Sequence, residues 1–206
     1  MKHVLPHDGP MIALQTGDEL LCSGRGRLSN LIAFYSKLAG IKGPAAEITH
    51  VAKYINGLVY EATTLNKWCG KKGYQANPLE DWLSRYDGRV WVRQVHDCGI
   101  DEYTYQQHAD ADLGTPYENG IPGFLELVLT SVALKHGPAW LKNWARKHLQ
   151  TKELHCSESN VRRSQQGGYY DTKARPNKLA PYTFWAGGEY EKGFTKGRLG
   201  PPIRIK

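Results

Sequence analysis

The sequence lacks the apolar segments that would direct it to or across a membrane. No run approaches the roughly 18 uninterrupted apolar residues of a membrane-spanning helix. The best candidate, 121–134, is broken by Pro122 and Glu126 and is typical of a buried helix instead. Residues 1–10 contain no apolar core of a signal peptide. We therefore expect a cytoplasmic protein without a transmembrane segment, although a phage-encoded protein that is released by lysis or carried in a particle also fits.

Cysteine is scarce, and its spacing excludes two common classes of site. The four cysteines, Cys22, Cys69, Cys98 and Cys156, contain no CxxC pair, which argues against a zinc ribbon and against a disulfide scaffold. The histidines form no cluster with metal-ligand spacing either. The sequence thus predicts no metal and no cofactor, and the position of each cysteine matters more than the number.

Positive charge is in excess but dispersed along the chain. The 27 Lys and Arg residues exceed the 20 Asp and Glu residues, for a net charge of +7. The densest basic runs are 71–72, 162–163 and the C-terminal end, and no basic stripe is interleaved with stacking aromatics. This pattern does not favour nucleic-acid recognition. Peripheral contact with an anionic surface stays open as an alternative.

Apolar periodicity and turn residues predict a mixture of helices and strands. Strands are expected at 19–22, 49–55, 58–63 and 89–95, and helices at 28–38, 78–86, 103–113, 124–135, 139–149 and 156–164. Gly17-Asp18 predicts a turn in which the Asp18 carboxylate bonds backbone amides. Residues 168–206, rich in Gly, Pro and Tyr, predict a largely irregular extension packed on a domain formed by 1–167.

The local structure that the sequence predicts most clearly is a β-hairpin at residues 49–63. Asn56-Gly57 lies between two runs of β-forming residues, and Asn-Gly is the strongest short-range hairpin signal because both turn residues need positive φ. A two-residue turn places Ile55 opposite Leu58. His50 and Glu61 then become diagonal neighbours on one face of the hairpin, a separation that long side chains can bridge.

Cys156 stands where a helix is expected to begin. The unpaired N–H groups and the dipole of a helix N-terminus favour an anion, and a nucleophilic cysteine must react as the thiolate. Such a nucleophile also needs an imidazole that is oriented by a third polar group. The hairpin offers His50 as this base and Glu61 as its orienting partner, and the backbone N–H of Cys156 is the expected first oxyanion donor.

Five short segments, in order, resemble the circularly permuted NlpC-type papain-like cysteine hydrolase superfamily. They are Gly-Asp-Glu-Leu-Leu at 17–21, the segment 23–38, the Thr-His-Val hairpin with its Glu-Ala at 49–62, Gly-Thr-Pro-Tyr at 114–117 and Leu-His-Cys-Ser-Glu at 154–158. Two positions depart from the pattern: His155 replaces a common aromatic, and Lys53 replaces an aliphatic residue. The superfamily includes peptidases of cell-wall peptides, acyltransferases related to lecithin:retinol acyltransferase, and uncharacterised bacterial, phage and poxvirus proteins.

This resemblance implies an α+β, papain-like fold in which a small antiparallel sheet packs against helices. It implies a cysteine-dependent acyl hydrolase with Cys156, His50 and Glu61 as the triad, acting on an amide, peptide or ester bond. The acyl substrate could be a cell-wall peptide, another peptide or a lipid. The alternative is a non-catalytic binding or structural protein that keeps the same fold with an unreactive Cys156.

Overall fold

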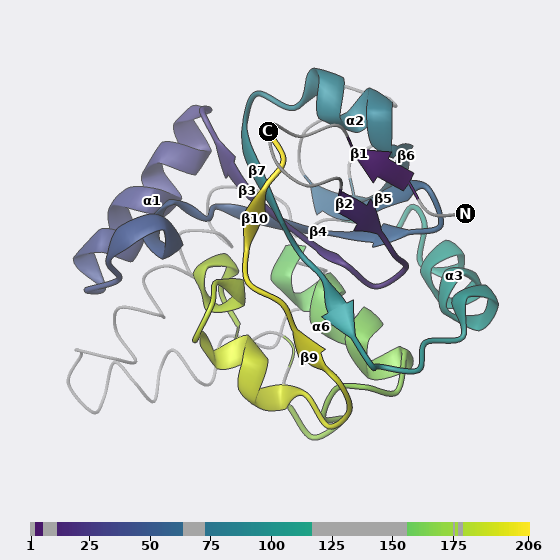
Figure 1. Cartoon of the computed structure of the whole chain (residues 1–206). Coiled ribbons are helices and arrows are strands. Elements are labelled where there is room, and N and C mark those ends of the chain that lie inside the picture. Colours follow the sequence, from purple (N-terminus) through teal and green to yellow (C-terminus); the bar gives the residue numbers. More distant parts are fainter. Residues whose placement is uncertain (1–2, 6–11, 64–72, 117–155, 175, 177–178) are drawn as a thin grey trace.

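The computed structural model shows a mixed helix–sheet fold around a six-stranded antiparallel sheet (Figure 1). It describes residues 3–5, 12–63, 73–116, 156–174, 176 and 179–206. The strands are β1 (His3–Leu5), β2 (Ile12–Leu14), β3 (Glu19–Gly24), β4 (His50–Ile55), β5 (Leu58–Thr63), β6 (Gly73–Pro78), β7 (Gly88–Arg93), β8 (Val95–His96), β9 (Arg198–Leu199) and β10 (Ile203–Arg204). The helices are α1 (Arg27–Leu38), α2 (Leu79–Arg85), α3 (Glu102–Ala111) and α6 (Cys156–Gln166), with 3₁₀ helices η1 (Gly43–Glu47), η3 (Pro181–Phe184) and η4 (Glu189–Gly193).

The main sheet has the strand order β10-β7-β3-β4-β5-β6, with antiparallel neighbours throughout. The strands β3 and β4 at its centre are paired so that Glu19 lies opposite Lys53 and Cys22 lies opposite His50. Strands β1 and β2 form one separate ribbon, and β8 and β9 form another. The predicted mixture of helices with an antiparallel sheet is therefore confirmed.

The turn between β4 and β5 has the predicted geometry. Asn56 and Gly57 have φ angles of 45° and 88°, and Ile55 pairs with Leu58. Both positive φ angles are those of a turn whose twist matches the twist of the flanking strands. This turn determines which residues of β4 and β5 share a face, so it also sets the positions of His50 and Glu61.

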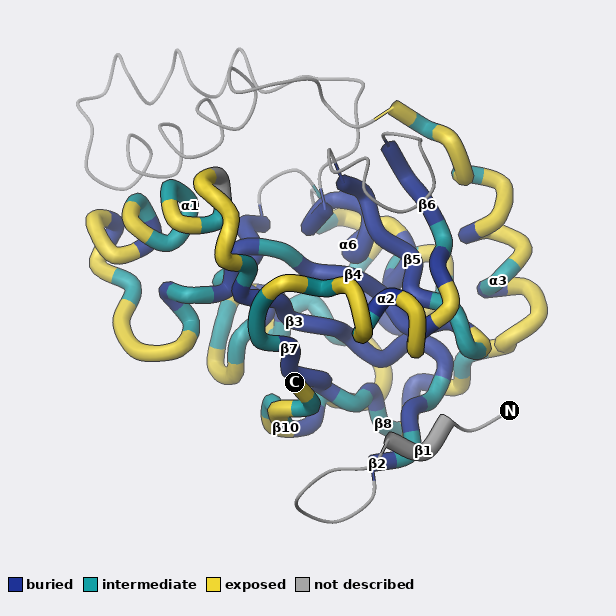
Figure 2. The backbone as a smooth tube through the Cα atoms, turned by 90° about the horizontal axis from the view of Figure 1, so that it is seen from above, coloured by how far each residue is buried: buried dark blue, intermediate teal, exposed yellow. Residues whose placement is uncertain are grey.

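Each face of the main sheet carries its own apolar core. Helix α6 packs against β4 and β5 on one face. The apolar cluster on that face includes Leu21, Val51 and Tyr60. Helix α2 packs against β5 and β6, where Leu20, Tyr54 and Trp82 belong to the other cluster. Figure 2 shows the buried central strands flanked by the largely exposed outer sides of α1, α2 and α3. Among the described residues, no helix combines the length and the apolar character needed to cross a bilayer.

Most predicted elements within the described residues are present, with one correction, and the unpredicted elements include β1, β2, η1 and β6. The strand predicted at 89–95 is wrong in extent, because β7 ends at Arg93 and Val95 belongs to β8, which pairs with β9 in another sheet. Strand β6 was not predicted, although its pairing with β5 extends the sheet by a full edge strand. The helices predicted at 124–135 and 139–149 lie outside the described residues.

The C-terminal segment contributes to the core of the sheet rather than only covering it. Its regular elements are short, as its composition predicts, but β10 pairs with β7 at the edge of the main sheet. Tyr170, Phe184 and Tyr190 are buried, and the Phe184 and Tyr190 rings stack with their centroids 3.9 Å apart. The domain boundary at residue 167 stays a prediction.

Asp18 forms the buried turn that the sequence predicts. Its carboxylate accepts a hydrogen bond from the backbone N–H of Gln15 at 2.9 Å and another from that of Val95 at 2.9 Å. Burial raises the pKa of this carboxyl to about 7, although the two backbone amides oppose the shift. Asp18 therefore joins the start of β3 to β8 and titrates near neutrality.

We expect Asp18→Asn to lower the free energy of unfolding by about 1–3 kcal/mol, because the amide NH₂ group cannot accept from a backbone N–H. Between about pH 4 and pH 7 the folded wild type binds a proton that the unfolded chain releases, so this group makes stability fall as pH rises. The stability difference between wild type and Asp18→Asn should therefore shrink over this range. Urea unfolding at pH 4.5 and pH 7.5 measures both quantities, and a difference that is constant or grows would contradict the assignment.

Candidate functional site

Cys156 is the first residue of α6, as predicted, and its side chain is buried with 6% exposure. The first turn is held by its own polar side chains. Ser159 Oγ and Asn160 Nδ2 both donate to the Cys156 carbonyl, at 2.8 and 3.1 Å. The thiol therefore sits at the positive end of an 11-residue helix, where an anion is stabilised.

Buried polar contacts hold α6 against the rest of the fold. The Arg163 guanidinium binds the Asp112 carboxylate and the His108 carbonyl, which ties α6 to α3. Lys53 Nζ donates to Ser164 Oγ at 2.9 Å, which ties α6 to β4. Since β4 also carries His50, the same strand supports both the helix of the thiol and its proposed base.

The structure brings His50 and Glu61 into direct contact, as the hairpin register predicts. His50 Nε2 lies 2.7 Å from Glu61 Oε2, and the Glu61 side chain is only 3% exposed. The Cys156 thiol lies close enough to the His50 ring for its hydrogen bonding and charge to raise the pKa of the imidazole. The three predicted site residues thus meet in one chain of contacts.

Two residues that sequence analysis did not identify orient Glu61. Gln75 Nε2 and Trp82 Nε1 each donate to Glu61 Oε1 at 3.1 Å. One carboxylate oxygen is therefore occupied by two neutral donors while the other faces the imidazole. Gln75 comes from β6 and Trp82 from α2, so the carboxylate is held from two further elements.

The electrostatics of the site favour a protonated His50. Burial lowers its pKa, but the hydrogen bond and the charge of Cys156, followed by those of Glu61, outweigh burial and raise the pKa to about 10. An imidazolium that persists to this pH is a cation held directly beside the thiol. A neighbouring cation is one of the standard means of stabilising a cysteine thiolate.

The other described cysteines lack this environment. Cys22 lies opposite His50 across β3 and β4, yet it is fully buried, and burial raises its pKa well above the usual value for a thiol. Burial also raises the pKa of Cys98. Raised pKa values keep both thiols protonated and unreactive, which agrees with the prediction that they are core residues. Cys69 lies outside the described residues, as does His155.

A metal centre has no support among the residues that the structure describes. Within 3–5, 12–63, 73–116, 156–174, 176 and 179–206, His, Cys, Asp and Glu side chains form no group of three or more that could hold an ion. The described side chains that meet at the site are a thiol, an imidazole and a carboxylate.

Comparison with models of protein families gives no match, and comparison with curated proteins gives no significant match.

Proposed function

We propose that this chain is a cysteine-dependent acyl hydrolase, in which Cys156 is the nucleophile, His50 the general base and acid, and Glu61 the group that orients His50. The carrying observation is the direct contact of the His50 ring with the Glu61 carboxylate, together with a Cys156 thiol close enough to raise the pKa of that ring. The His50 imidazole thus has two ionisable neighbours, the Cys156 thiol and the Glu61 carboxylate. That combination is the pattern of an activated nucleophile.

In the proposed reaction His50 holds the proton that Cys156 has released to it, and the thiolate sulfur attacks the carbonyl carbon of an amide, ester or thioester. The carbonyl oxygen becomes an oxyanion, for which the backbone N–H groups at the start of α6 are the proposed donors. The bond between the carbonyl carbon and its leaving group then breaks, and His50 gives its proton to that group. Water, activated by the now neutral His50, hydrolyses the resulting thioester.

The charge balance of the site suits both halves of this cycle. Before acylation the negative charges of Cys156 and Glu61 both raise the pKa of His50. Formation of the acyl-enzyme removes the thiolate charge, so one of these two causes disappears and the pKa of His50 falls. His50 therefore changes from a group that retains its proton into one that can release it to the leaving group.

The fold type belongs to the same proposal. A nucleophile at a helix start beside a histidine on an antiparallel sheet supports the papain-like arrangement, and the order of His50 before Cys156 supports its circularly permuted, NlpC-type form. The support comes from the hairpin of β4 and β5, the start of α6 at Cys156 and the central sheet.

The proposal predicts covalent acylation of Cys156 by a simple activated ester. We expect 4-nitrophenyl acetate to give a burst of nitrophenolate close to one equivalent per chain, with an acetyl group on Cys156 by peptide mass spectrometry. Cys156→Ala should lose the burst while keeping the slow background reaction of surface groups. Cys98→Ala is the matched control and should keep the burst.

Equal bursts in wild type and Cys156→Ala, or acetylation confined to lysines, would contradict the proposal. That outcome would support a binding or structural protein with an unreactive thiol.

A further inference from the structure

A basic groove of about 690 Å³ lies between α1 and the end of the central sheet. This volume is in the range of small-molecule binding sites. Four cationic side chains line it, namely Arg25, Lys37, Arg89 and Arg204, together with the carboxylate of Glu47. Glu47 pairs with Arg89, so the positive charge of the described lining residues exceeds the negative charge.

The groove lies at the end of β3 and β4 where His50 begins its strand. Thr49 and Ser23 form part of its lining. Thr49 precedes His50 in the sequence and Ser23 follows Cys22, and His50 pairs with Cys22 across β4 and β3. The Thr49 hydroxyl also accepts from the backbone N–H of Gly24 at 3.2 Å, which joins two residues of the lining.

The groove and the thiol lie on the same side of the sheet. The Arg89 guanidinium lies 5.4 Å from the centroid of the Trp91 ring. Trp91 in turn belongs to the apolar cluster that contains Cys156. The groove therefore borders the apolar cluster to which Cys156 belongs.

We propose that this groove binds an oxyanion group, a phosphate or a carboxylate, carried by the acyl substrate whose carbonyl is attacked by Cys156. The inference rests on the proposed function and narrows it to negatively charged acyl compounds. Guanidinium groups bind both kinds of oxyanion through paired N–H donors, and a cationic groove raises the local concentration of an anionic substrate.

The test compares two alkylating agents at Cys156, anionic iodoacetate and neutral iodoacetamide. In both, the thiolate sulfur forms a bond to the methylene carbon and iodide leaves, so only the charge of the reagent differs. We expect Lys37→Glu to lower the ratio of the iodoacetate rate to the iodoacetamide rate by about three- to tenfold at low ionic strength. Arg204→Gln should lower it in the same direction with a smaller effect.

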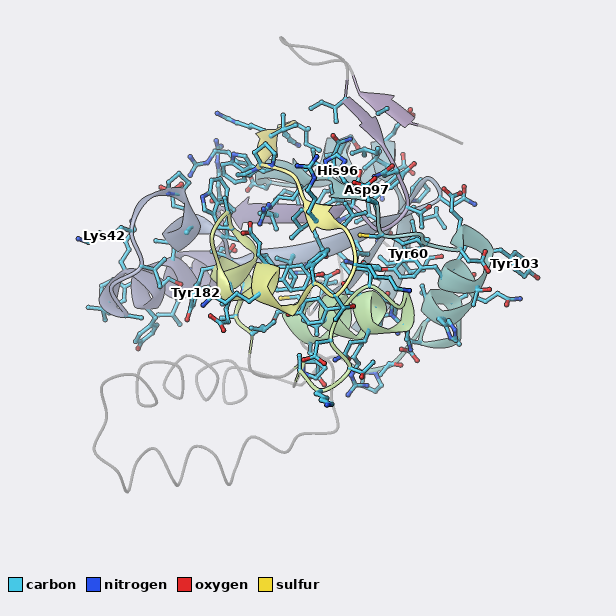
Figure 3. The ribbon with its side chains drawn as sticks, turned by 60° about the horizontal axis from the view of Figure 1, so that its bottom comes forward. Lys42, Tyr60, His96, Asp97, Tyr103 and Tyr182 are labelled. Atoms are coloured by element: carbon cyan, nitrogen blue, oxygen red, sulfur yellow. The ribbon has the colours of Figure 1, made fainter. Side chains whose placement is uncertain are left out.

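Lys42→Glu is the matched control. Lys37 lies within α1, and Lys42 lies shortly after the end of that helix. Lys42 does not line the groove, and its side chain points away from the body of the protein (Figure 3). The charge change is identical, so we expect less than half of the effect of Lys37→Glu.

Competition distinguishes the two sources of the oxyanion. Inorganic phosphate and succinate, added separately at equal ionic strength, should each slow iodoacetate labelling more than chloride does, and the stronger competitor identifies the preferred group. An unchanged rate ratio in Lys37→Glu, equal effects of Lys37→Glu and Lys42→Glu, or no competition beyond chloride would overturn the groove as a substrate site. Slow labelling of wild type by both reagents would instead contradict the reactive thiol itself.

Discussion

His50→Ala is expected to slow the alkylation of Cys156 by iodoacetamide about tenfold or more at pH 5, while leaving it within about threefold of wild type at pH 9. The pKa of His50, raised to about 10, keeps the imidazolium beside Cys156 throughout this range. An ordinary thiol has a pKa of about 8.5 and is almost wholly protonated at pH 5. Removal of the cation should therefore matter most at low pH. Peptide mass spectrometry after timed labelling measures the rate at each cysteine.

Glu61→Gln should give an intermediate profile. The substitution removes one of the charges that raise the pKa of His50 but leaves Cys156 beside the ring. His108→Ala is the matched control, because His108 is an exposed histidine of α3, and this variant should label as wild type does. Cys98 serves as an internal reference in every sample. Labelling of Cys156 that is slow at pH 5 and unaffected by His50→Ala would show that the contact chain is structural.

Lys53→Met is expected to lower the free energy of unfolding by about 3–5 kcal/mol, the usual cost of leaving a buried charge without its partner. Lys53 and Glu19 are directly opposed on β4 and β3, and both side chains are 0% exposed. Lys53 Nζ also donates to Ser164 Oγ at 2.9 Å and to the Tyr169 hydroxyl at 3.1 Å. The Tyr190 hydroxyl donates to Glu19. The pair therefore joins the central sheet to α6 and to the C-terminal segment.

The pH dependence of this variant has a definite sign. Burial raises the pKa of Glu19, and the charge of Lys53 opposes that shift, so Lys53→Met should raise this pKa further. A raised carboxyl pKa gives stability that is present at low pH and is lost as pH rises. The loss in Lys53→Met should consequently be smaller at pH 5 than at pH 7.5, as measured by urea unfolding.

The double variant Glu19→Gln/Lys53→Met should recover more than half of the loss, because it removes both buried charges and keeps an acceptor for Tyr190. Lys192→Met is the exposed counterpart. Lys192 pairs with Glu189 at 2.7 Å with 70% and 61% side-chain exposure, and such a pair contributes no more than about 1 kcal/mol. A loss in Lys53→Met no greater than that in Lys192→Met, or no recovery in the double variant, would contradict the importance of the buried pair.

Local sequence determined the parts of the site that depend on short-range geometry. Asn56-Gly57 sets the turn, the turn sets the register of β4 and β5, and the register places His50 beside Glu61. The position of Cys156 at the start of α6 also follows from sequence alone. These features involve neighbouring residues or one two-residue turn, so few alternative conformations compete with them.

Parts of the fold that depend on pairing between distant strands could not be predicted in this way. The split between β7 and β8 arises because Val95 pairs with Leu199, far along the chain. Strand β6 contains Gly73, Asn77 and Pro78, residue types that are depleted in strands, so its own pattern does not predict it. Gln75 and Trp82 become hydrogen-bond donors to Glu61 only when β6 and α2 pack beside β5. The β-propensity of a segment does not identify the strand with which it pairs, because that propensity depends on the packing around the strand in the folded protein.

Sequence by itself thus determined the hairpin with His50 and Glu61 and the helix that begins at Cys156, since turn geometry and helical periodicity act over a few residues. Only the tertiary structure decided that α6 docks with its first residue at His50. The reason is that this docking depends on side chains distant in sequence, above all Lys53 with Ser164 and Arg163 with Asp112. Lys53 stands where the resembled superfamily usually has an aliphatic residue. The tertiary structure places it in a buried ion pair, because only the folded chain brings Glu19 opposite it.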